Sequence, residues 1–340
     1  MVRLRAFSKT FAILAVALGL AAGACLLPQD EYQRWQLLDG TIHARARWIY
    51  ERCRFDPTPI DVAFIGPSRT GAGVNAPRLG EALAARGLPS NVVNLSLPEG
   101  GRNINYAVAE QLLEHKQPRL IVIGVTEKPQ RTGHSAFKYL APAELIANPG
   151  YIGNLNYLSD LIYLPYRQMR LFVANLAPGP MGLTKTFEPS VYLGQSIDTT
   201  GSVVLPDGRI KEGESPASAM ELHRGVRKLE AGLHPPMLPA SLADVEFGDE
   251  RYYIRKITAL AKARHVKIAF LFLPYYSGPK QVQEERFYEG FGPVWNEGYL
   301  APHANLYADY GHLTRKGAEQ LTDALAEPVG ELLTPTKVRR

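Results

Sequence analysis

The first residue whose type and position suit chemistry is Ser68. It comes directly after the apolar run of residues 61–65, in a tight turn with the sequence GPSRT at residues 66–70. In an open parallel α/β sheet, ligands bind at the carboxyl ends of the strands, and a serine in such a turn can present its hydroxyl to solvent. The backbone N–H groups that follow can then help to bind an oxyanion. The alternative is that Ser68 only caps the next helix.

A second group, Asp309 and His312, stands in the segment YADYGHLT at residues 307–314, between the last long loop and the last helix. Aspartate and histidine three residues apart in such a turn can point to the same side. His312 could then accept the Ser68 proton as a general base, while Asp309 accepts a hydrogen bond from the other ring nitrogen and stabilises the imidazolium. The alternative is a surface histidine beside a helix cap, with Thr314 as that cap.

Alternating short strands and helices must position these residues. Residues 61–65, 91–95 and 120–125 are apolar and bounded by turn residues, which predicts buried strands. Helical segments at 77–87 and 104–116 separate them. This order, with its short connections, predicts a parallel sheet covered by helices on both faces. We therefore expect an α/β fold.

The same rhythm returns near the end of the chain. We predict a helix at 249–264, a strongly apolar strand at 267–273, a long loop at 274–304 and a final helix at 314–333. The α/β body thus resumes after a long interruption.

Residues 128–247 form that interruption, and we interpret them as an insertion. They contain an apolar, aromatic segment at 157–176 and a hairpin that begins at 202–205 and returns at Ile210, around a Pro-Asp-Gly turn at 206–208. We expect the insertion to lie over the active edge of the sheet and to supply substrate contacts. The alternative is a separate small domain.

The N-terminal part of the chain has a different character. Residues 11–27 are 17 uncharged, mostly apolar residues behind a basic start, a pattern typical of a signal-peptide core or a short membrane anchor. The positive-inside rule then places the body on the exported, periplasmic side of the cell envelope. A buried N-terminal helix of a soluble protein is the alternative. We expect residues 1–28 to be this segment, 29–56 a helical stalk or packing helix that leads from the membrane, and 57–340 the body.

Composition excludes several classes of site. The formal net charge is +5, but six basic residues lie near the two ends of the chain, so the body is close to neutral. We therefore expect no nucleic-acid partner. The only cysteines are Cys25 and Cys53, and Cys25 lies in the apolar run, which excludes a disulfide framework and a Cys-His metal cluster. We predict no metal and no cofactor.

A Gly-x-Ser-x-Thr turn after the first strand, with Asp-x-x-His before the last helix, resembles the SGNH (GDSL-like) hydrolases. The resemblance covers residues 60–127 and 249–333. It implies a three-layer, flavodoxin-like fold and acyl-ester chemistry through a covalent acyl-serine, with Ser68 as nucleophile, His312 as base and Asp309 as orienting acid. The chain is most similar to the membrane-anchored, exported branch that works in cell-envelope O-acylation, which includes the alginate-acetylation and D-alanylation accessory proteins.

The resemblance also implies donors to the oxyanion, and here the sequence departs from the family. The usual second block is an Asn followed by a donating Gly; Asn94 fits, but Glu99 stands where that Gly is expected, so Gly100 or Gly101 would serve with a one-residue shift. The usual third block, Gly-x-Asn-Asp, lacks its Asn in this chain. Glu127, at the end of that block, is a candidate substrate contact, with a capping role as the alternative.

These observations favour an exported serine esterase or O-acyltransferase that acts on acyl esters, in the first instance acetyl esters, of an envelope or secreted polysaccharide. Its partners would be the polysaccharide or another acyl-ester substrate, the membrane and a multi-span membrane acyltransferase. The alternative is a non-catalytic polysaccharide-binding or assembly protein on the same fold. A flavodoxin-like nucleotide binder is disfavoured, because the glycines around Ser68 do not form a phosphate loop with its lysine.

Overall fold

The computed structural model describes residues 2–204, 210–232 and 236–334, except for the side chains of 2–8, 202–204 and 210–212. The turn of the predicted hairpin, at residues 206–208, lies outside the described residues. At the centre of the molecule is a five-stranded sheet in which every neighbouring pair is parallel. Its strands are β1 (Val62–Ile65), β2 (Val92–Asn94), β3 (Leu120–Val125), β6 (Lys267–Phe272) and β7 (Val294–Asn296).

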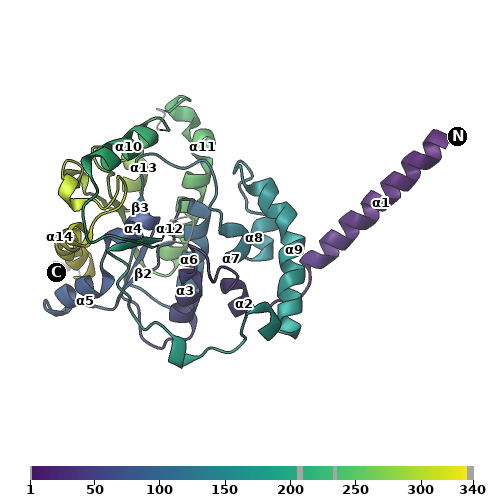
Figure 1. Cartoon of the computed structure of the whole chain (residues 1–340), viewed down its shortest axis with the longest axis horizontal. Helices are drawn as coiled ribbons and strands as arrows, with labels where there is room; N and C mark the ends of the chain where they lie inside the picture. Colours follow the sequence, from purple (N-terminus) through teal and green to yellow (C-terminus); the bar gives the residue numbers. More distant parts are fainter. Residues whose placement is uncertain (1, 205–209, 233–235, 335–340) are drawn as a thin grey trace, which may run out of the picture.

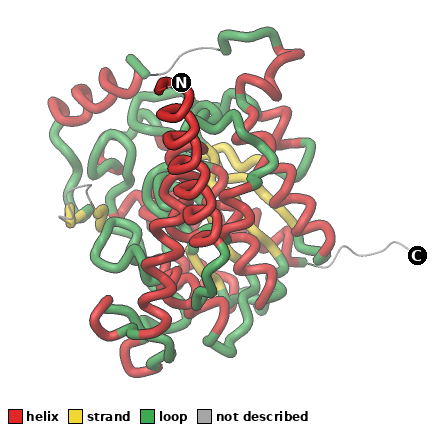
Figure 2. Tube along the Cα trace, turned by 90° about the vertical axis from the view of Figure 1, so that its right-hand side faces the viewer, coloured by secondary structure: helices red, strands yellow, loops and turns green. Residues whose placement is uncertain are grey.

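The order of these strands across the sheet is β2-β1-β3-β6-β7. This is the flavodoxin-like order, in which strands are first added on one side of β1 and then on its other side. Helices cover both faces (Figures 1 and 2). On one face lie α3 (Arg45–Arg54), α6 (Arg102–His115) and α12 (Gly248–Ala263), and on the other α4 (Ser68–Gly73), α5 (Ala76–Ala84) and α14 (Arg315–Leu333). The α/β prediction is therefore confirmed.

The alternation of side chains along each strand explains the two cores. Val62 and Phe64 pack with α5 and α14, whereas Ala63 and Ile65 pack with α3, α6 and α12. Successive side chains of a strand point to opposite faces, and both faces are covered, so β1 is apolar throughout. This is why short uninterrupted apolar runs in the sequence mark the strands.

One expectation about the sheet was wrong. The predicted loop at 274–304 contains α13 (Glu285–Glu289) and the edge strand β7. The strand pairs with β6 through only three residues, Val294 to Asn296. A segment this short carries too few residues to show a period of two, so its pairing comes from its position beside β6 rather than from a local pattern.

Residues 29–56 do not form one continuous stalk. They fold as α2 (Glu31–Trp35), a series of turns and α3, and the break falls at Gly40, whose φ is +76°. Trp35 and Trp48 are buried in the core, and the Trp48 indole N–H donates to the Gly194 carbonyl at 2.9 Å. This segment is therefore part of the folded body, and the packing alternative describes it better than the stalk.

Helix α1 (Val2–Cys25) extends away from the body (Figure 1). Its apolar side chains from Phe11 to Leu20 are largely exposed, as Phe11 at 65% and Ile13 at 71% show. Among the residues that the structure describes, no helix is long and apolar enough to cross a membrane. The membrane anchor stays a prediction.

The insertion at 128–247 wraps around the body. Its longest helix, α9 (Tyr157–Leu176), coincides with the predicted apolar segment and packs against α1, α2 and α7 (Phe137–Leu140). Of the two hairpin strands, β4 (Ser202–Val204) contacts α4, and β5 (Ile210–Glu212) pairs with β4. The exposed side chains of α9 form an apolar stripe with helical spacing, consisting of Leu158, Ile162, Tyr166, Met169, Val173 and Leu176.

Asp249, in the first turn of α12, is a buried carboxyl group whose two oxygens have no hydrogen-bond partner among the described residues. Burial, with smaller contributions from Glu250 and Asp160, raises the pKa of Asp249 to about 7 against the opposing effect of Arg102. The folded protein therefore holds a proton on this group at pH values where an unfolded chain has released it.

Replacing Asp249 with asparagine is expected to raise the free energy of unfolding at pH 8 and to change it little at pH 5. In the wild type the raised pKa means that stability is lost as pH rises from the ordinary carboxyl range toward 7. One pKa unit corresponds to about 1.4 kcal/mol, so the gain is on the order of 1–4 kcal/mol. Urea unfolding at both pH values measures it, with the exposed Asp244→Asn as control. An equal effect at the two pH values would contradict the assignment.

Candidate active site

Ser68 is the first residue of α4 and follows β1 through the two-residue connection Gly66-Pro67. It therefore lies at the carboxyl end of β1, beside the point where the strand order reverses. The connection is tight because the Thr70 side chain packs between the backbones of Gly66 and Gly124, where a Cβ on either glycine would collide with it. These two glycines allow the turn to hold the serine close to the sheet.

Three side chains form a continuous hydrogen-bonded chain at this position. The Ser68 hydroxyl lies 2.8 Å from His312 Nε2, and His312 Nδ1 lies 2.9 Å and 3.0 Å from the two carboxylate oxygens of Asp309. Because a carboxylate can only accept, Nδ1 carries the proton and Nε2 is free to accept from the serine. The structure thus brings together the nucleophile, base and acid positions suggested by the sequence, although 244 residues separate Ser68 from His312.

Local backbone contacts fix the turn that carries the acid and the base. Ala308 N–H donates to the His312 carbonyl at 2.9 Å, and Tyr307 pairs with Leu313 in an isolated antiparallel bridge. Thr314 caps α14 by accepting from the Gly317 N–H at 3.1 Å. The Thr314 helix cap that the sequence suggested as an alternative is therefore present, together with the hydrogen bond between His312 and Ser68.

Asp309 is held in its charged form. Burial by itself would raise its pKa, but hydrogen bonding and charge interaction with His312, together with the N–H groups of Gly311 and His312, lower the pKa of Asp309 to about 2. A carboxylate that receives several N–H donors behaves in this way. It is therefore negative at neutral pH and can stabilise a protonated His312.

Arg69, next to the nucleophile, forms a bidentate ion pair with Glu127. Its Nη2 lies 2.6 Å from Glu127 Oε2, Nη1 contacts Oε1, and Nη1 also donates to the Leu273 carbonyl at 2.9 Å. Glu127 is buried and also accepts from the Tyr275 N–H at 3.3 Å. The expectation that Glu127 contacts substrate was therefore wrong, because its oxygens are occupied in joining the ends of β1, β3 and β6. The sequence alone did not single out Arg69.

Asn94 is also a structural residue. Its side chain is buried, and Nδ2 donates to the carbonyls of Thr70 and Val74 at 3.0 Å each. Thr70 lies within α4 and Val74 is its C-cap, so Asn94 fixes the helix that carries Ser68. It has no free donor for an oxyanion or a substrate, which corrects the sequence interpretation.

Gly100 and Gly101 lie against the insertion rather than in the cavity that Ser68 lines. A Cβ on Gly100 would collide with Gln130, and one on Gly101 with His134. Gly101 has a φ of +138°, and Glu99, although it is not a glycine, has a φ of +65°. This is the left-handed region that a glycine adopts without strain. The one-residue shift proposed from the sequence is therefore not needed, because Glu99 itself takes the glycine-like conformation.

The variant Glu99→Gly is expected to be about 1 kcal/mol more stable than Glu99→Ala, since left-handed φ costs a non-glycine residue roughly that amount. Both variants lose the same contacts of the Glu99 carboxylate to Ser135 and His43, so their difference isolates the backbone strain. Chemical denaturation of the two variants measures it. A glycine variant no more stable than the alanine variant would show that residue 99 is not strained.

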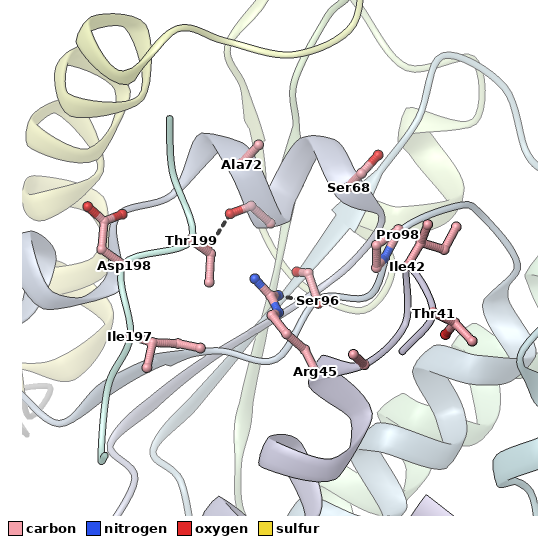
Figure 3. A pocket seen from close by; sticks show the side chains of 12 residues that line it. Thr41, Ile42, Arg45, Ser68, Ala72, Ser96, Pro98, Ile197, Asp198 and Thr199 are labelled. Atoms are coloured by element: carbon pink, nitrogen blue, oxygen red, sulfur yellow. Dashed lines mark hydrogen bonds between the residues drawn. The ribbon is translucent and has the colours of Figure 1, made fainter. Parts of the chain in front are cut away.

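A cavity of about 220 Å³ opens beside the nucleophile (Figure 3). Its walls come from α4, from the start of α3, from the loop after β2 and from residues 197–199 of the insertion. The lining residues are Thr41, Ile42, Ala44, Arg45, Ser68, Gly71, Ala72, Ser96, Pro98, Ile197, Asp198 and Thr199. It is large enough for a small part of a substrate, such as one acyl group or one sugar substituent.

His43, Glu99 and His134 bring their ligand atoms within 4.8 Å of one another, which raises the question of a metal site. His134 argues against it, because Nε2 lies 2.6 Å from the Pro98 carbonyl and Nδ1 accepts from the Ala136 N–H at 3.0 Å. Burial lowers the pKa of His134 to about 3, so the ring is neutral and both nitrogens are in use. The cluster fits a hydrogen-bonded support for the Pro98-Glu99 loop.

Comparisons with known proteins do not assign a function to the chain. No protein-family model matches the chain, and no curated protein matches it. Among solved structures, the chain is similar to a crystal structure from Bacteroides fragilis described as a "putative acylhydrolase", at 10% sequence identity and a TM-score of 0.35. The match covers 87% of this chain and 98% of that one. A likeness this distant carries no functional argument, and the assignment depends on the geometry of Ser68, His312 and Asp309.

Proposed function

We propose that this chain is a serine esterase or O-acyltransferase of the SGNH type that acts on acyl esters. The observation that carries the proposal is the hydrogen-bonded chain from Ser68 through His312 to Asp309 at the carboxyl end of a parallel sheet. A hydroxyl, an imidazole and a carboxylate in this arrangement are the parts of an activated serine nucleophile.

In the proposed reaction Ser68 Oγ attacks the ester carbonyl carbon while His312 Nε2 takes the hydroxyl proton. The tetrahedral intermediate collapses, His312 returns the proton to the departing alkoxide, and an acyl-serine remains. Water, or a hydroxyl group of an acceptor, then attacks the acyl-serine and gives its proton to His312. The second tetrahedral intermediate collapses with cleavage of the bond between the acyl carbon and Ser68 Oγ, and His312 returns the proton to Ser68. Hydrolysis and transfer thus share every residue and differ only in the second nucleophile.

We assign the oxyanion donors to the backbone N–H groups of Ser68 and Glu99. Neither N–H makes a hydrogen bond within the described part of the chain. Ser68 is the first residue of α4, where an N–H has no partner inside its own helix. A backbone donor explains how Glu99 can stand in the place of the family's glycine, since the side chain takes no part.

Membrane attachment and a polysaccharide substrate belong to the same proposal. Two observations support attachment: the exposed apolar side chains of α1, and the apolar stripe of α9, which packs beside α1. An exposed apolar face of this kind is typical of a helix that contacts a lipid surface or another protein. We propose that the body sits at the exported face of the membrane and processes an envelope or secreted polysaccharide, with a multi-span acyltransferase as donor where transfer occurs.

The direct test is turnover of p-nitrophenyl acetate by the full chain, with mass spectrometry of the quenched reaction. The expected result is release of p-nitrophenol and a 42-Da acetyl adduct on the peptide that contains Ser68, removable by hydroxylamine. The absence of both turnover and adduct would contradict the esterase proposal.

A second candidate is the non-catalytic polysaccharide-binding or assembly protein. It is favoured by one observation, namely that the residues lining the cavity include no asparagine or glutamine that could serve as a side-chain oxyanion donor. If it is correct, the wild type binds polysaccharide without forming an acyl adduct, and Ser68→Ala binds equally well.

A further inference from the structure

Arg45, the first residue of α3, lines the cavity beside Ser68. Its Nη2 donates to the Ser96 carbonyl, and its Nε is buried without a hydrogen-bond partner. No carboxylate among the described residues forms an ion pair with it. Figure 3 shows the side chain reaching from the start of α3 toward Ser96, below the helix that begins with Ser68.

Other arginines in the interior have a carboxylate partner or several carbonyl acceptors, which makes Arg45 unusual. Arg34 Nε also lacks a hydrogen-bond partner among the described residues, but its guanidinium pairs with Glu31 at 2.6 Å. Arg69 pairs with Glu127, and Arg102 pairs with Glu250 at 2.7 Å. Arg167 has no carboxylate, but its guanidinium donates to backbone carbonyls, including that of Ala141 at 2.7 Å, and to the Gln168 side chain at 3.0 Å. Arg45 alone in this group keeps an unpaired N–H beside a cavity.

A second unpaired polar atom lies in the same place. Ser96 Oγ is buried and has no hydrogen-bond partner among the described residues, and Ser96 also lines the cavity. A Cβ placed on Gly71 of α4 would be 3.6 Å from Ser96 Cβ and 3.7 Å from Arg45 Nη2. Both polar groups therefore lie against α4, within one helical turn of the nucleophile.

The described residues supply no counter-charge at this position. Burial lowers the pKa of Arg45 to about 10, which still leaves it positively charged at neutral pH. The nearest acid of the lining, Asp198, is neutralised by Arg315 at 2.7 Å and accepts from Thr200. A buried cation without a counter-charge reduces stability, so a role in binding explains its presence better than a role in folding.

We propose that Arg45 and Ser96 form a subsite for a carboxylate carried by the substrate whose ester Ser68 processes. That the bound molecule is a substrate rests on the proposed esterase function. That it carries an anionic group is inferred from the unpaired Arg45 Nε and Ser96 Oγ. One unbalanced positive charge matches one carboxylate, and a guanidinium with a hydroxyl gives it charge-assisted hydrogen bonds. The carboxylate can belong to the acyl group or to the alcohol part of the ester.

Binding tests the subsite without any need for turnover. Isothermal titration of the full chain with D-glucuronate and with D-glucose compares a carboxylate with its neutral counterpart. We expect the wild type to bind glucuronate at least about 10-fold more tightly than glucose, because a charge-assisted pair of this kind is worth roughly that factor. Arg45→Gln should remove the preference, Arg45→Lys should keep part of it, and the surface variant Arg78→Gln should match the wild type.

Equal affinity of the wild type for the two sugars, or an unchanged glucuronate affinity in Arg45→Gln, would overturn the proposal. Thermal melting shows whether Arg45→Gln is folded; if it is not, Ser96→Ala takes its place and should weaken glucuronate binding several-fold. An unchanged affinity in folded Ser96→Ala would then count equally against the subsite.

Two esters distinguish the sources of the carboxylate. p-Nitrophenyl hemisuccinate carries it on the acyl group, and an O-acetylated glucuronate carries it on the alcohol. For the ester that reaches the subsite, Arg45→Gln should lower kcat/KM at least about 10-fold, while p-nitrophenyl acetate turnover changes little. A wild type that turns over no ester would refute the esterase function and leave the titration result standing, so the two failures are distinguishable.

Discussion

Replacing Ser68 with alanine is expected to lower kcat for p-nitrophenyl acetate by at least about 10³-fold and to abolish the acyl adduct. Nucleophile and base act as one unit, so loss of either one alone removes most of the rate enhancement, and values up to about 10⁶ are known for this arrangement. His312→Ala should therefore lose about as much as Ser68→Ala, and the double variant little more. Stopped assays with adduct analysis by mass spectrometry measure these losses.

Ser218→Ala is a suitable control, because this exposed hydroxyl accepts from the Glu221 N–H in the insertion and has no hydrogen bond to His312 or Glu99. It should retain activity close to that of the wild type. If Ser68→Ala and His312→Ala kept more than about a tenth of wild-type turnover, the activity would come from another nucleophile, and the catalytic assignment would fail.

Asp309→Asn is expected to reduce kcat by about 10²- to 10⁴-fold while leaving the fold intact. The amide can keep the contacts of Oδ1 to the Gly311 and His312 N–H groups, but an NH₂ group at the position of Oδ2 turns a donor toward His312 Nδ1. The ring then favours the tautomer whose proton sits on Nε2, which cannot accept from Ser68.

The pH profile separates this effect from a general loss of structure. The pKa of Asp309 in the wild type is about 2, so protonation of this carboxylate should not limit the wild-type rate anywhere above about pH 4. The control Asp323→Asn, which removes an exposed carboxylate paired with Arg78, should keep wild-type kcat. A kcat for Asp309→Asn within a few-fold of the wild type would mean that this carboxylate does not orient the base.

The parts of this site that the sequence predicts are those with a strong local signal. Ser68 follows an apolar strand, and Asp309 and His312 share one turn, so their positions at strand and helix ends follow from short patterns. The turn with Ser68 and the turn with His312 can meet because β1 and β6 have their carboxyl ends on the same side of the sheet. Parallel pairing supplies that condition.

The parts that the sequence could not supply depend on contacts between distant residues. In the sequence nothing indicates that Glu127 is paired. The fold shows that it forms an ion pair with Arg69, which lies 58 residues earlier in the chain. The sequence position of Asn94 suggests an oxyanion donor, but its side-chain N–H groups donate to the carbonyls of Thr70 and Val74. Arg45 has no motif at all, and its isolation from carboxylates is visible only once its neighbours are known.

The large separation between Ser68 and His312 also has a consequence for biosynthesis. A chain emerging from the ribosome folds from its N-terminal side, yet His312 and Asp309 lie just before α14, the last helix that the structure describes. Until this segment has been synthesised and β6 has paired with β3, Ser68 has no base and remains an unreactive alcohol. We therefore expect an incomplete chain not to react with esters that it meets before folding is complete. A reagent that labels activated serines should then label Ser68 only in fully synthesised, folded molecules.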